Sequence, residues 1–415
     1  MSDVEDLTTT AKKTTSSVHD VAADKPPFGS RFLTEEADVW SQNAWDHVPP
    51  PDDQDETIAK SLEKQRLAPV PQEEKGKYNE KPARHWDNFY KNNASNFFRN
   101  RKWLHNEFPE LVAAAQPEAG PMAIAEIGCG AGNSVFPLLS ANTNPKLSLH
   151  AYDYSNHAVK LVQNDPLYKN PPTGTIHAAV WDVTSANELP EDVQPGTIDI
   201  VILVFVMSAL HPDEWGRAIS NIHKMLKPGG LAVFRDYGRY DLTQLRFKGG
   251  RLLDDNFYIR GDKTRVYFFE LDELALLFTG SVVSPTQKTT DTTSQVLEDA
   301  DSESRMGELI SSPAPDSPAP EFDSLGDVLT SIETQSTSHA SEVPDGDQNS
   351  TPTDSGIHST STTRIHPNLL SPFPGCPLYP LFSIEQLGVD RRLLINRKRQ
   401  LKMYRVWMQG KFRKR

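Results

Sequence analysis

Three glycines at alternate positions are the residues of this chain best suited to cradle a nucleotide. Gly128, Gly130 and Gly132 follow an apolar run within Ala123 to Asn133, and Glu126 lies two residues before the first glycine. Glycine lets the backbone turn tightly and approach a ligand, and a helix beginning near residue 133 would direct free N–H groups at it. The third glycine comes two residues after the second, so the spacing differs from the dinucleotide fingerprint G-x-G-x-x-G.

Two aspartates downstream lie where a bound nucleoside would need them. The stretch from Ser148 to Tyr152 is typical of a strand and ends at Asp153, which is suited to accept both ribose hydroxyls. The next predicted strand, 174–180, precedes Asp182, which is placed to accept a hydrogen bond from an adenine amino group. Each signal alone has an ordinary explanation, because an aspartate after a strand often caps a helix. Together with E-x-G-x-G-x-G, their order resembles motif I and the following strands of class I S-adenosylmethionine-dependent methyltransferases.

The elements that must position these residues alternate between strands and helices. Residues 198–206 are almost continuously apolar and β-branched, which predicts a central parallel strand covered on both faces. A helix over 213–226, a turn at 228–230 and a strand over 231–234 follow. Ligands of open α/β sheets bind at the carboxyl ends of the strands, so Leu203 and Val206 are expected to line the site.

Four side chains near this edge are candidates for the chemistry. Arg235, Asp236 and Tyr237 follow the predicted strand over 231–234, and three polar groups at a strand tip favour a function. His211 follows the central strand, but a lone histidine before a proline is more often a cap or a surface residue, and both interpretations stay open. Asp236 is the best candidate to stabilise a positive charge that develops on a substrate.

An aromatic helix precedes the glycines. Trp86 and Tyr90 are four residues apart, so they share a helix face. One interpretation is a core stripe completed by Phe89, and the other is an aromatic lid over the cofactor.

Composition favours one core domain flanked by unfolded segments. Only 37% of the 415 residues are hydrophobic and 32 are proline. Residues 28–50 are dense in aromatic side chains, which indicates either packing on the main domain or an arm that contacts RNA. A helix over 57–67 and a linker over 69–77 are expected next. Two cysteines cannot form a disulfide framework or a zinc site, and no apolar run could span a bilayer, so we expect a cytoplasmic or nuclear protein without a metal.

Charge is unevenly distributed along the chain. Residues 281–363 carry fifteen Asp and Glu against Lys288 and Arg305, which accounts for the whole formal charge of −13. With thirty Ser and Thr, this stretch is expected to be a disordered acidic insertion. Residues 391–415 carry eleven Lys and Arg and no acid, which indicates either a solvated tail or a surface for a phosphate backbone, with a final strand over 402–409.

Several motifs resemble one family closely, the METL family of tRNA (cytosine-N3)-methyltransferases. The resemblance is to members of fungal appearance that act on threonine tRNA, and it extends over the arm and most of 78–280 and 385–415. The motifs that carry it are Phe28-Gly29-Ser30-Arg31, Asn43-Ala44-Trp45-Asp46, His85-Trp86-Asp87-Asn88-Phe89-Tyr90, Phe205-Val206-Met207-Ser208-Ala209-Leu210-His211, Phe234-Arg235-Asp236-Tyr237-Gly238, Leu245-Arg246-Phe247, Asn256-Phe257-Tyr258-Ile259-Arg260 and Asp390-Arg391-Arg392-Leu393. One departure is Lys263, which stands where the family usually repeats glycine.

The resemblance implies a fold, a reaction and a set of site residues. The fold would be the seven-stranded class I methyltransferase, and the reaction would methylate N3 of cytosine 32 in the anticodon loop of threonine tRNA, with serine tRNA also open. Cytosine N3 has a free lone pair, so orientation and not a general base should do most of the catalysis. The implied cofactor contacts are Trp86, Tyr90, Gly128, Asp153, Asp182, Val183 and Leu203.

The expected organisation has five parts, and several questions stay open. Rival functions are methylation of another RNA, a protein or a small molecule, and a catalytically silent tRNA-binding subunit. The isoacceptor, the oligomeric state and a protein partner, either an accessory protein or an aminoacyl-tRNA synthetase, are not determined. The expected parts are a disordered 1–27, a tRNA-contacting arm and linker over 28–77, the first part of the methyltransferase domain over 78–280, the insertion over 281–377, and the last strands with a basic tail over 378–415.

Overall fold

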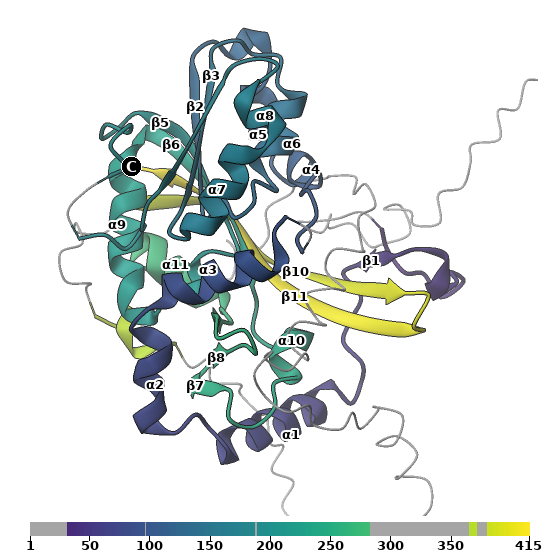
Figure 1. Ribbon diagram of the computed structural model, residues 1–415. Coiled ribbons are helices and arrows are strands. Elements are labelled where there is room, and N and C mark those ends of the chain that lie inside the picture. The colour runs from purple at the N-terminus through teal and green to yellow at the C-terminus, as the bar shows by residue number, and fades with distance from the viewer. Residues whose placement is uncertain (1–30, 96, 187–188, 283–364, 372–379) are drawn as a thin grey trace, which may run out of the picture. The chain divides into compact units, whose positions relative to one another are not determined.

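The computed structural model describes residues 31–95, 97–186, 189–282, 365–371 and 380–415 (Figure 1). The expected disordered N-terminus and most of the expected acidic insertion lie outside the described residues.

The described residues form one eight-stranded sheet in the order β1-β10-β11-β6-β5-β2-β3-β4. The five strands from β6 to β4 are parallel, and β11 joins β6 antiparallel. This arrangement confirms the α/β class I methyltransferase fold, with an eighth strand added by the arm. The strands are β1 (Ala44–Asp46), β2 (Met122–Ile127), β3 (Leu147–Asp153), β4 (Thr175–Val180), β5 (Ile198–Val204), β6 (Leu226–Tyr237), β10 (Phe382–Asn396) and β11 (Leu401–Lys414).

Helices cover both faces of the sheet because the central strands are apolar on both sides. In β5, Ile200 and Ile202 belong to a core that includes residues of α6, while Val201 and Leu203 belong to a second core with α9 and α11. Figure 1 shows α9 and α6 on opposite sides of the strands. The flanking helices are α4 (Leu104–Glu107), α5 (Pro109–Ala114), α6 (Val135–Ala141), α7 (Asn156–Asn164), α8 (Pro166–Lys169), α9 (Trp215–Met225) and α11 (Leu271–Thr279).

A smaller layer lies beyond the carboxyl ends of the parallel strands. It contains the aromatic helix and a three-stranded sheet in the order β7-β8-β9. These elements are α3 (Pro82–Asn93), α10 (Leu242–Leu245), β7 (Leu252–Asp254), β8 (Phe257–Ile259) and β9 (Arg265–Tyr267).

The N-terminal arm packs on the long hairpin formed by β10 and β11. β1 pairs antiparallel with β10, and the fully buried Trp45 donates from Nε1 to the carbonyl of Val39 at 2.8 Å. Trp45 packs with Leu393 and Ile395 of β10. The structure therefore displays the first interpretation of residues 28–50, in which the arm packs on the main domain. Its strand β1 extends the sheet.

Two helices connect the arm to the main domain. α1 (Gln54–Leu67) is held by the buried Gln65, whose Nε2 donates to the carbonyl of Gln244 at 2.8 Å. We expected a linker over 69–77, but α2 (Gln72–Asn79) is a helix. Proline just before its start and acids in its first turn favour a helix N-terminus, and the charge of that stretch concealed this signal.

Strand β6 is longer than expected. We predicted a strand over 231–234 with a reactive tip, but β6 continues to Tyr237 because β11 pairs with it along that length. Arg235 therefore faces Gln409 of β11 in the register, and Asp236 faces Met408. The expected turn at 228–230 lies at a break in the pairing with β5, where the register passes from Leu226 directly to Leu231 and Gly229 has a φ of 73°.

Candidate active site

A pocket lies along the carboxyl ends of the parallel strands, where the sequence placed the site. Its wall includes the ends of five strands together with α3 and the loop after β8. The residues at the strand ends are Trp181 and Asp182 after β4, Asp153 and Tyr154 at β3, Ile127 and Gly128 at β2, Val204, Phe205 and Val206 at β5, and Tyr237 at β6.

The glycine loop has no room for side chains. Gly128 and Gly130 adopt positive φ angles of 65° and 54°. A Cβ atom at Gly128 would lie 2.7 Å from Val206 Cγ2, and one at Gly130 would collide with the hydroxyl of Tyr90. Glycine is therefore required by backbone conformation and by close packing.

Asp153 is a buried carboxylate with acceptor capacity to spare. It accepts from Gly130 N at 2.9 Å on one oxygen and from Ser155 N at 2.8 Å on the other. Burial raises the pKa of Asp153 to about 6, because no cation compensates the desolvation. Each oxygen keeps a second lone pair, so the group can still accept two hydroxyl hydrogen bonds.

Asp182 and Val183 lie at the far end of the same wall. Asp182 is exposed, and its Oδ1 accepts from Thr184 N and Thr184 Oγ1, both at 2.8 Å. Val183 is buried beside it, and both residues line the pocket.

The aromatic helix α3 serves as core and as pocket wall at once. Trp86 stacks on Tyr90 with ring centroids 5.9 Å apart, as their spacing predicted, and Phe89 packs edge-on against both. All three line the pocket, although Phe89 and Tyr90 are also buried in a cluster. Asp87 fastens the helix to α7, because its Oδ1 accepts from Ser155 Oγ at 2.8 Å.

Three expected cofactor residues, Glu126, Gly132 and Leu203, do not line the pocket. Glu126 is buried and accepts from Val135 N at 3.2 Å at the start of α6. Burial raises the pKa of Glu126 to about 7, even though Arg101 lies 3.5 Å away. Gly132 and Leu203 are not among the residues that line the pocket, and Leu203 packs in the core.

The other end of the pocket combines aromatic rings with a buried acid. The Tyr237 ring lies 4.8 Å from that of Phe205, and the guanidinium of Arg260 lies over it at 5.5 Å. Asp236 is fully buried and accepts from Ser208 N at 2.9 Å and Tyr237 N at 2.8 Å. Burial raises the pKa of Asp236 to about 6. Asp236 thus lies directly behind the pocket wall formed by Ser208 and Tyr237.

His211 caps a short helix and does not line the pocket. Its Nδ1 accepts from Asp213 N at 3.3 Å, and its own N–H donates to Glu214 at 2.7 Å. Its ring packs edge-on against Phe257. The structure therefore displays the capping interpretation.

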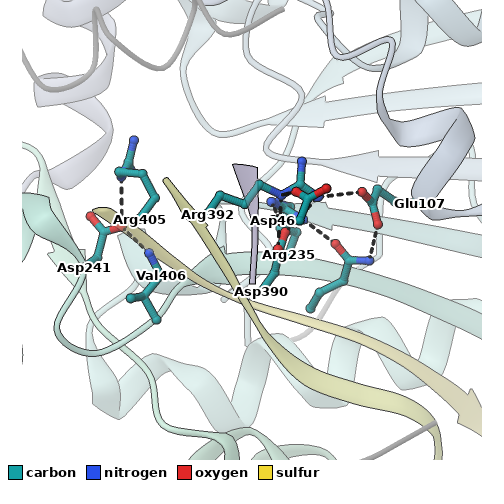
Figure 2. Close-up of polar contacts among 9 residues, drawn as sticks. Asp46, Glu107, Arg235, Asp241, Asp390, Arg392, Arg405 and Val406 are labelled. Carbon is teal, nitrogen blue, oxygen red and sulfur yellow. Dashed lines mark hydrogen bonds and ion pairs between the residues drawn. The ribbon is translucent and has the colours of Figure 1, made fainter. Parts of the chain in front are cut away.

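Arg235 also points away from the pocket, into a buried cluster of charges that we call the ion-pair cluster. Figure 2 shows this cluster beside a second contact, in which Asp241 accepts from Arg405 and from the backbone of Val406. The ion-pair cluster consists of Asp46 of β1, Glu107 of α4, Arg235 of β6, Asp390 and Arg392 of β10, and Gln409 of β11.

Hydrogen bonds close the ion-pair cluster into a ring. Arg235 donates to Asp390 at 2.6 Å and to Gln409, and Gln409 donates to Glu107 at 3.0 Å. Arg392 completes the ring by donating to Glu107 at 2.8 Å and to Asp390 at 3.1 Å. Although burial opposes it, the two arginines lower the pKa of Asp390 to about 2. The ring fastens the hairpin to the sheet, so Arg235 is a structural residue in this arrangement.

Arg101, Arg260, Phe205 and Ser208 line the pocket but were not singled out from the sequence as site residues. Phe205 has a positive φ of 59°, and its N–H donates to the carbonyl of Arg235 at 2.8 Å. The basic, aromatic run before Trp103 was a usable signal for Arg101. Lys263, which stands where the family usually repeats glycine, has a φ of 68°, and this is the conformation that favours glycine.

The basic residues at the end of β11 are engaged within the chain. Arg413 donates to the carbonyl of Gly229 at 2.6 Å and pairs with Glu385, while Lys414 donates to the carbonyl of His223 at 2.6 Å. These contacts lie where β6 begins, at the edge opposite the pocket. Exposed cations also gather at the turn between β10 and β11, namely Arg397, Lys398, Arg399 and Lys402. Two of them contact the arm, because Arg397 donates to the carbonyl of Ser41 at 2.8 Å and the Lys402 ammonium lies over the ring of Trp40.

In the described part of the chain, no group of three or more His, Cys, Asp or Glu could hold a metal ion. Among the described helices, none is long and apolar enough to cross a bilayer.

Fold and pocket together define the class as that of the S-adenosylmethionine-dependent methyltransferases. The pocket fits that cofactor, because Gly128 lines it and Asp153 offers unshared lone pairs beside the glycine loop. The family model described as a methyltransferase domain matches residues 125–232.

Relatives narrow the class to one family. The chain is 51% identical over 253 residues to the tRNA(Thr) (cytosine(32)-N(3))-methyltransferase of Saccharomyces cerevisiae, which covers 61% of this chain and 40% of that protein. It is 47% identical to the tRNA N(3)-methylcytidine methyltransferase trm140 of Schizosaccharomyces pombe, over 64% of this chain and 85% of that protein. It is 36% identical to the tRNA N(3)-cytidine methyltransferase METTL2 of Xenopus tropicalis, over 66% and 89%. The chain belongs to the family of tRNA N(3)-methylcytidine methyltransferases.

Proposed function

We propose that this chain methylates N3 of cytosine 32 in the anticodon loop of threonine tRNA, using S-adenosylmethionine. The observation that carries the proposal is a single pocket with two chemically different ends. One end joins the glycine loop to Asp153, and the other joins Phe205, Tyr237 and Arg260. The first end suits a nucleoside cofactor, and the second suits a planar base.

The cofactor end would be held by residues that the sequence already indicated. Asp153 would accept the two ribose hydroxyls, Asp182 and Val183 would contact the adenine, and Trp86 and Tyr90 would cover the cofactor from α3. When bound, S-adenosylmethionine supplies a methyl group on a positively charged sulfur. Glu126 would act indirectly, by holding the start of α6 and Arg101.

The acceptor end of the pocket would have to orient the base, but it would not need to supply a general base. The lone pair on N3 of neutral cytosine lies in the plane of the ring and carries no proton, so orientation is the main requirement. An unpaired loop base costs little to extrude, and Phe205 and Tyr237 offer rings on which it can stack. The described residues that line the pocket include no histidine or lysine.

Asp236 would act electrostatically from behind the wall. Methylation of N3 makes the base cationic, and a carboxylate near a developing positive charge stabilises it. The Asp236 carboxylate accepts from the N–H groups of Ser208 and Tyr237, both of which line the pocket. Its charge is held next to the acceptor end, although the side chain itself does not line the pocket.

The tRNA would contact the arm and the tip of the hairpin. Arg397, Lys398, Arg399 and Lys402 are exposed at that tip, and a phosphate backbone favours clustered cations. A cytoplasmic location, with the nucleus as the alternative, and a protein partner, either an accessory protein or a synthetase, are further parts of this proposal. The first is testable by imaging a tagged chain, and the second by comparing methylation with and without added extract.

Nucleoside mass spectrometry tests the proposed reaction directly. A threonine tRNA transcript incubated with the purified chain and S-adenosylmethionine should gain N3-methylcytidine. A transcript with uridine at position 32 is the matched control and should gain none, and a serine tRNA transcript tests the second isoacceptor. Formation of N3-methylcytidine in the uridine-32 control would contradict the proposal. So would its absence from both the threonine and the serine transcript when extract is added.

A further inference from the structure

The aromatic helix α3 covers the pocket largely through apolar packing. It contributes Trp86, Phe89 and Tyr90 to the pocket wall, and these side chains share a cluster with Ala158 and Leu161 of α7. Figure 1 shows α3 next to α7. Apolar contacts are not directional, so this packing alone does not fix the position of α3 over the pocket.

Asp87 supplies a directional contact between the two helices. Its Oδ1 accepts from Ser155 Oγ at 2.8 Å and from His157 N at 3.1 Å, at the start of α7. The dipole of α7 also favours a carboxylate at this end. Among the described residues, no other side chain of α3 forms a hydrogen bond with α7 or with its N-cap. Asp87 is therefore the contact that aligns α3 with α7.

Ser155 links this contact to the cofactor end of the pocket. It is fully buried and caps α7 by accepting from Ala158 N at 3.2 Å. Its own N–H donates to Asp153 Oδ1 at 2.8 Å, while its hydroxyl donates to Asp87. One serine thus binds both the acid that would hold the ribose and the acid that holds α3.

The chain leaves α3 through a strained residue. Ala94 has a φ of 49° and a ψ of −137°, a conformation that glycine ordinarily adopts. Strained backbone of this kind persists only where surrounding contacts impose it, and it is common in segments that switch. Strain at the end of α3 favours displacement of the helix, and the contact made by Asp87 opposes that displacement.

We propose that Asp87 is a positioning residue that holds α3 closed over the cofactor, and that breaking its contact with Ser155 lets the spent cofactor leave. Asp87 is not among the described residues that line the pocket, so it acts through α3. Trp86 and Tyr90 cover the cofactor from that helix, so movement of α3 opens the way out. This inference rests on the cofactor assignment in the proposed function, but not on the identity of the methyl acceptor.

Stopped-flow fluorescence measures binding and release of S-adenosylhomocysteine. Trp86 lines the pocket and should report occupancy, and a plot of the observed rate against ligand concentration gives association as the slope and release as the intercept. In Asp87→Ala the release rate should rise roughly 10- to 30-fold, while association stays within about threefold. This increase is the low end of the range for one hydrogen bond to a charged group, because the Asp87 side chain is 34% exposed.

Three further variants distinguish the contact from a general effect on folding. Asp87→Asn keeps an oxygen that can accept from Ser155 and His157, so its release rate should stay within about threefold of that of the unmodified protein. Asn88→Ala, an exposed position on the same helix, is the matched control and should change neither rate. Ser155→Ala breaks the same contact from the other side, so combined with Asp87→Ala it should raise release by less than the product of the two single effects.

Several outcomes would overturn the proposal. One is a release rate in Asp87→Ala within about twofold of that of the unmodified protein, and another is equal acceleration in Asp87→Asn or Asn88→Ala. Calorimetry supplies the binding stoichiometry, and fewer sites per chain at an unchanged release rate would assign Asp87 to folding alone. If the unmodified protein binds no S-adenosylhomocysteine, the cofactor assignment of the proposed function fails. If the unmodified protein binds it and Asp87→Ala releases it at the same rate, only the role of Asp87 fails.

Discussion

Buried charges occur both in the pocket and in the ion-pair cluster, and the two regions compensate them differently. In the ion-pair cluster, Asp390 faces two arginines at hydrogen-bond distance, and its pKa falls to about 2 despite burial. At the pocket, Asp153 in the wall and Asp236 behind it accept only from uncharged N–H or O–H donors, and burial raises the pKa of each to about 6. The ion pairs of the cluster hold elements together, whereas the carboxylates at the pocket have no cation at hydrogen-bond distance and keep their charge beside the site.

Neighbouring residues of one strand divide between these two regions. Arg235 and Asp236 are adjacent in β6, yet Arg235 enters the ion-pair cluster and Asp236 lies behind the pocket wall. Alternate residues of a strand point to opposite faces, so a single strand can serve the scaffold on one side and the site on the other. The comparison predicts that substitutions in the two regions separate loss of stability from loss of function.

The largest expected effect is on stability, from Asp390→Asn. This variant leaves Arg235 and Arg392 buried without their shared carboxylate, and breaking a buried pair costs about 3–5 kcal/mol. Urea denaturation followed by circular dichroism measures the free energy of unfolding. Asp153→Asn is the matched control and should change it by less than about 1 kcal/mol, because no cation depends on Asp153. Equal losses in the two variants would break the comparison.

Cofactor binding should show the next largest effect, in Asp153→Ala. The ribose would lose two hydrogen bonds to a charged acceptor, which are worth about 1.5–3 kcal/mol each, so affinity should fall at least roughly 100-fold. Calorimetry with S-adenosylhomocysteine measures it. Unchanged affinity would remove the cofactor assignment for this pocket.

Turnover should fall in Asp236→Asn without loss of the cofactor. The isosteric change removes the charge behind Ser208 and Tyr237, and we expect turnover to fall by roughly 10- to 100-fold. Single-turnover methylation of a threonine tRNA transcript measures the rate, and calorimetry checks that cofactor affinity is retained. A rate close to that of the unmodified protein would show that Asp236 has no electrostatic role in transfer.

The pKa values of the two regions predict different responses to pH. Below about pH 6 Asp153 becomes protonated in the free protein, so affinity for S-adenosylhomocysteine should fall by up to about tenfold per pH unit. The same raised pKa means that protonation of Asp153 favours the folded state as the pH falls from 6 toward 3.8. Asp390, with its lowered pKa, contributes stability above about pH 3.8 that is lost only as the pH falls through about 2.

Calorimetry and circular dichroism across a pH series separate these effects. Between pH 7 and pH 5 the protein should lose cofactor affinity while its far-ultraviolet spectrum stays unchanged. The weak residual binding of Asp153→Asn should lack the same dependence. Parallel loss of structure and affinity would mean that the two regions do not titrate independently.

The smallest expected effect concerns tRNA. Changing Arg397, Lys398 and Arg399 at the hairpin tip to alanine should weaken tRNA binding and reduce the log-log salt slope by roughly 0.7–0.9 for each phosphate that is no longer neutralised. The matched control changes Arg413, Lys414 and Arg415, which removes the same charge at the other end of the hairpin. Filter binding across a salt series should show a flattened slope only for the tip variant. A flattened slope only for the variant of Arg413, Lys414 and Arg415 would show that the phosphate contacts lie at the end of the chain.

Local sequence alone was sufficient for the cofactor end of the pocket. The strand from Met122 to Ile127, the glycine loop and Asp153 lie together because each follows its own strand, and parallel strands bring their carboxyl ends to one edge. Trp86 and Tyr90 stack because helical spacing puts them on one face. Each of these signals lies within a few residues of its own strand or helix, and one general rule for parallel sheets brings the strand ends together, so the sequence was sufficient to predict them.

Contacts between distant segments decided the rest. Nothing local distinguishes Arg235, which pairs with a residue 155 positions away, from Asp236, which faces a loop only 28 positions away. The role of Arg413 likewise depends on the antiparallel register of β11 with β6, which brings it to the carbonyl of Gly229. The sequence shows that these residues are charged but not which groups they meet. Only the partners that folding brings within hydrogen-bond distance determine whether a charge is neutralised in the scaffold or left uncompensated beside the pocket.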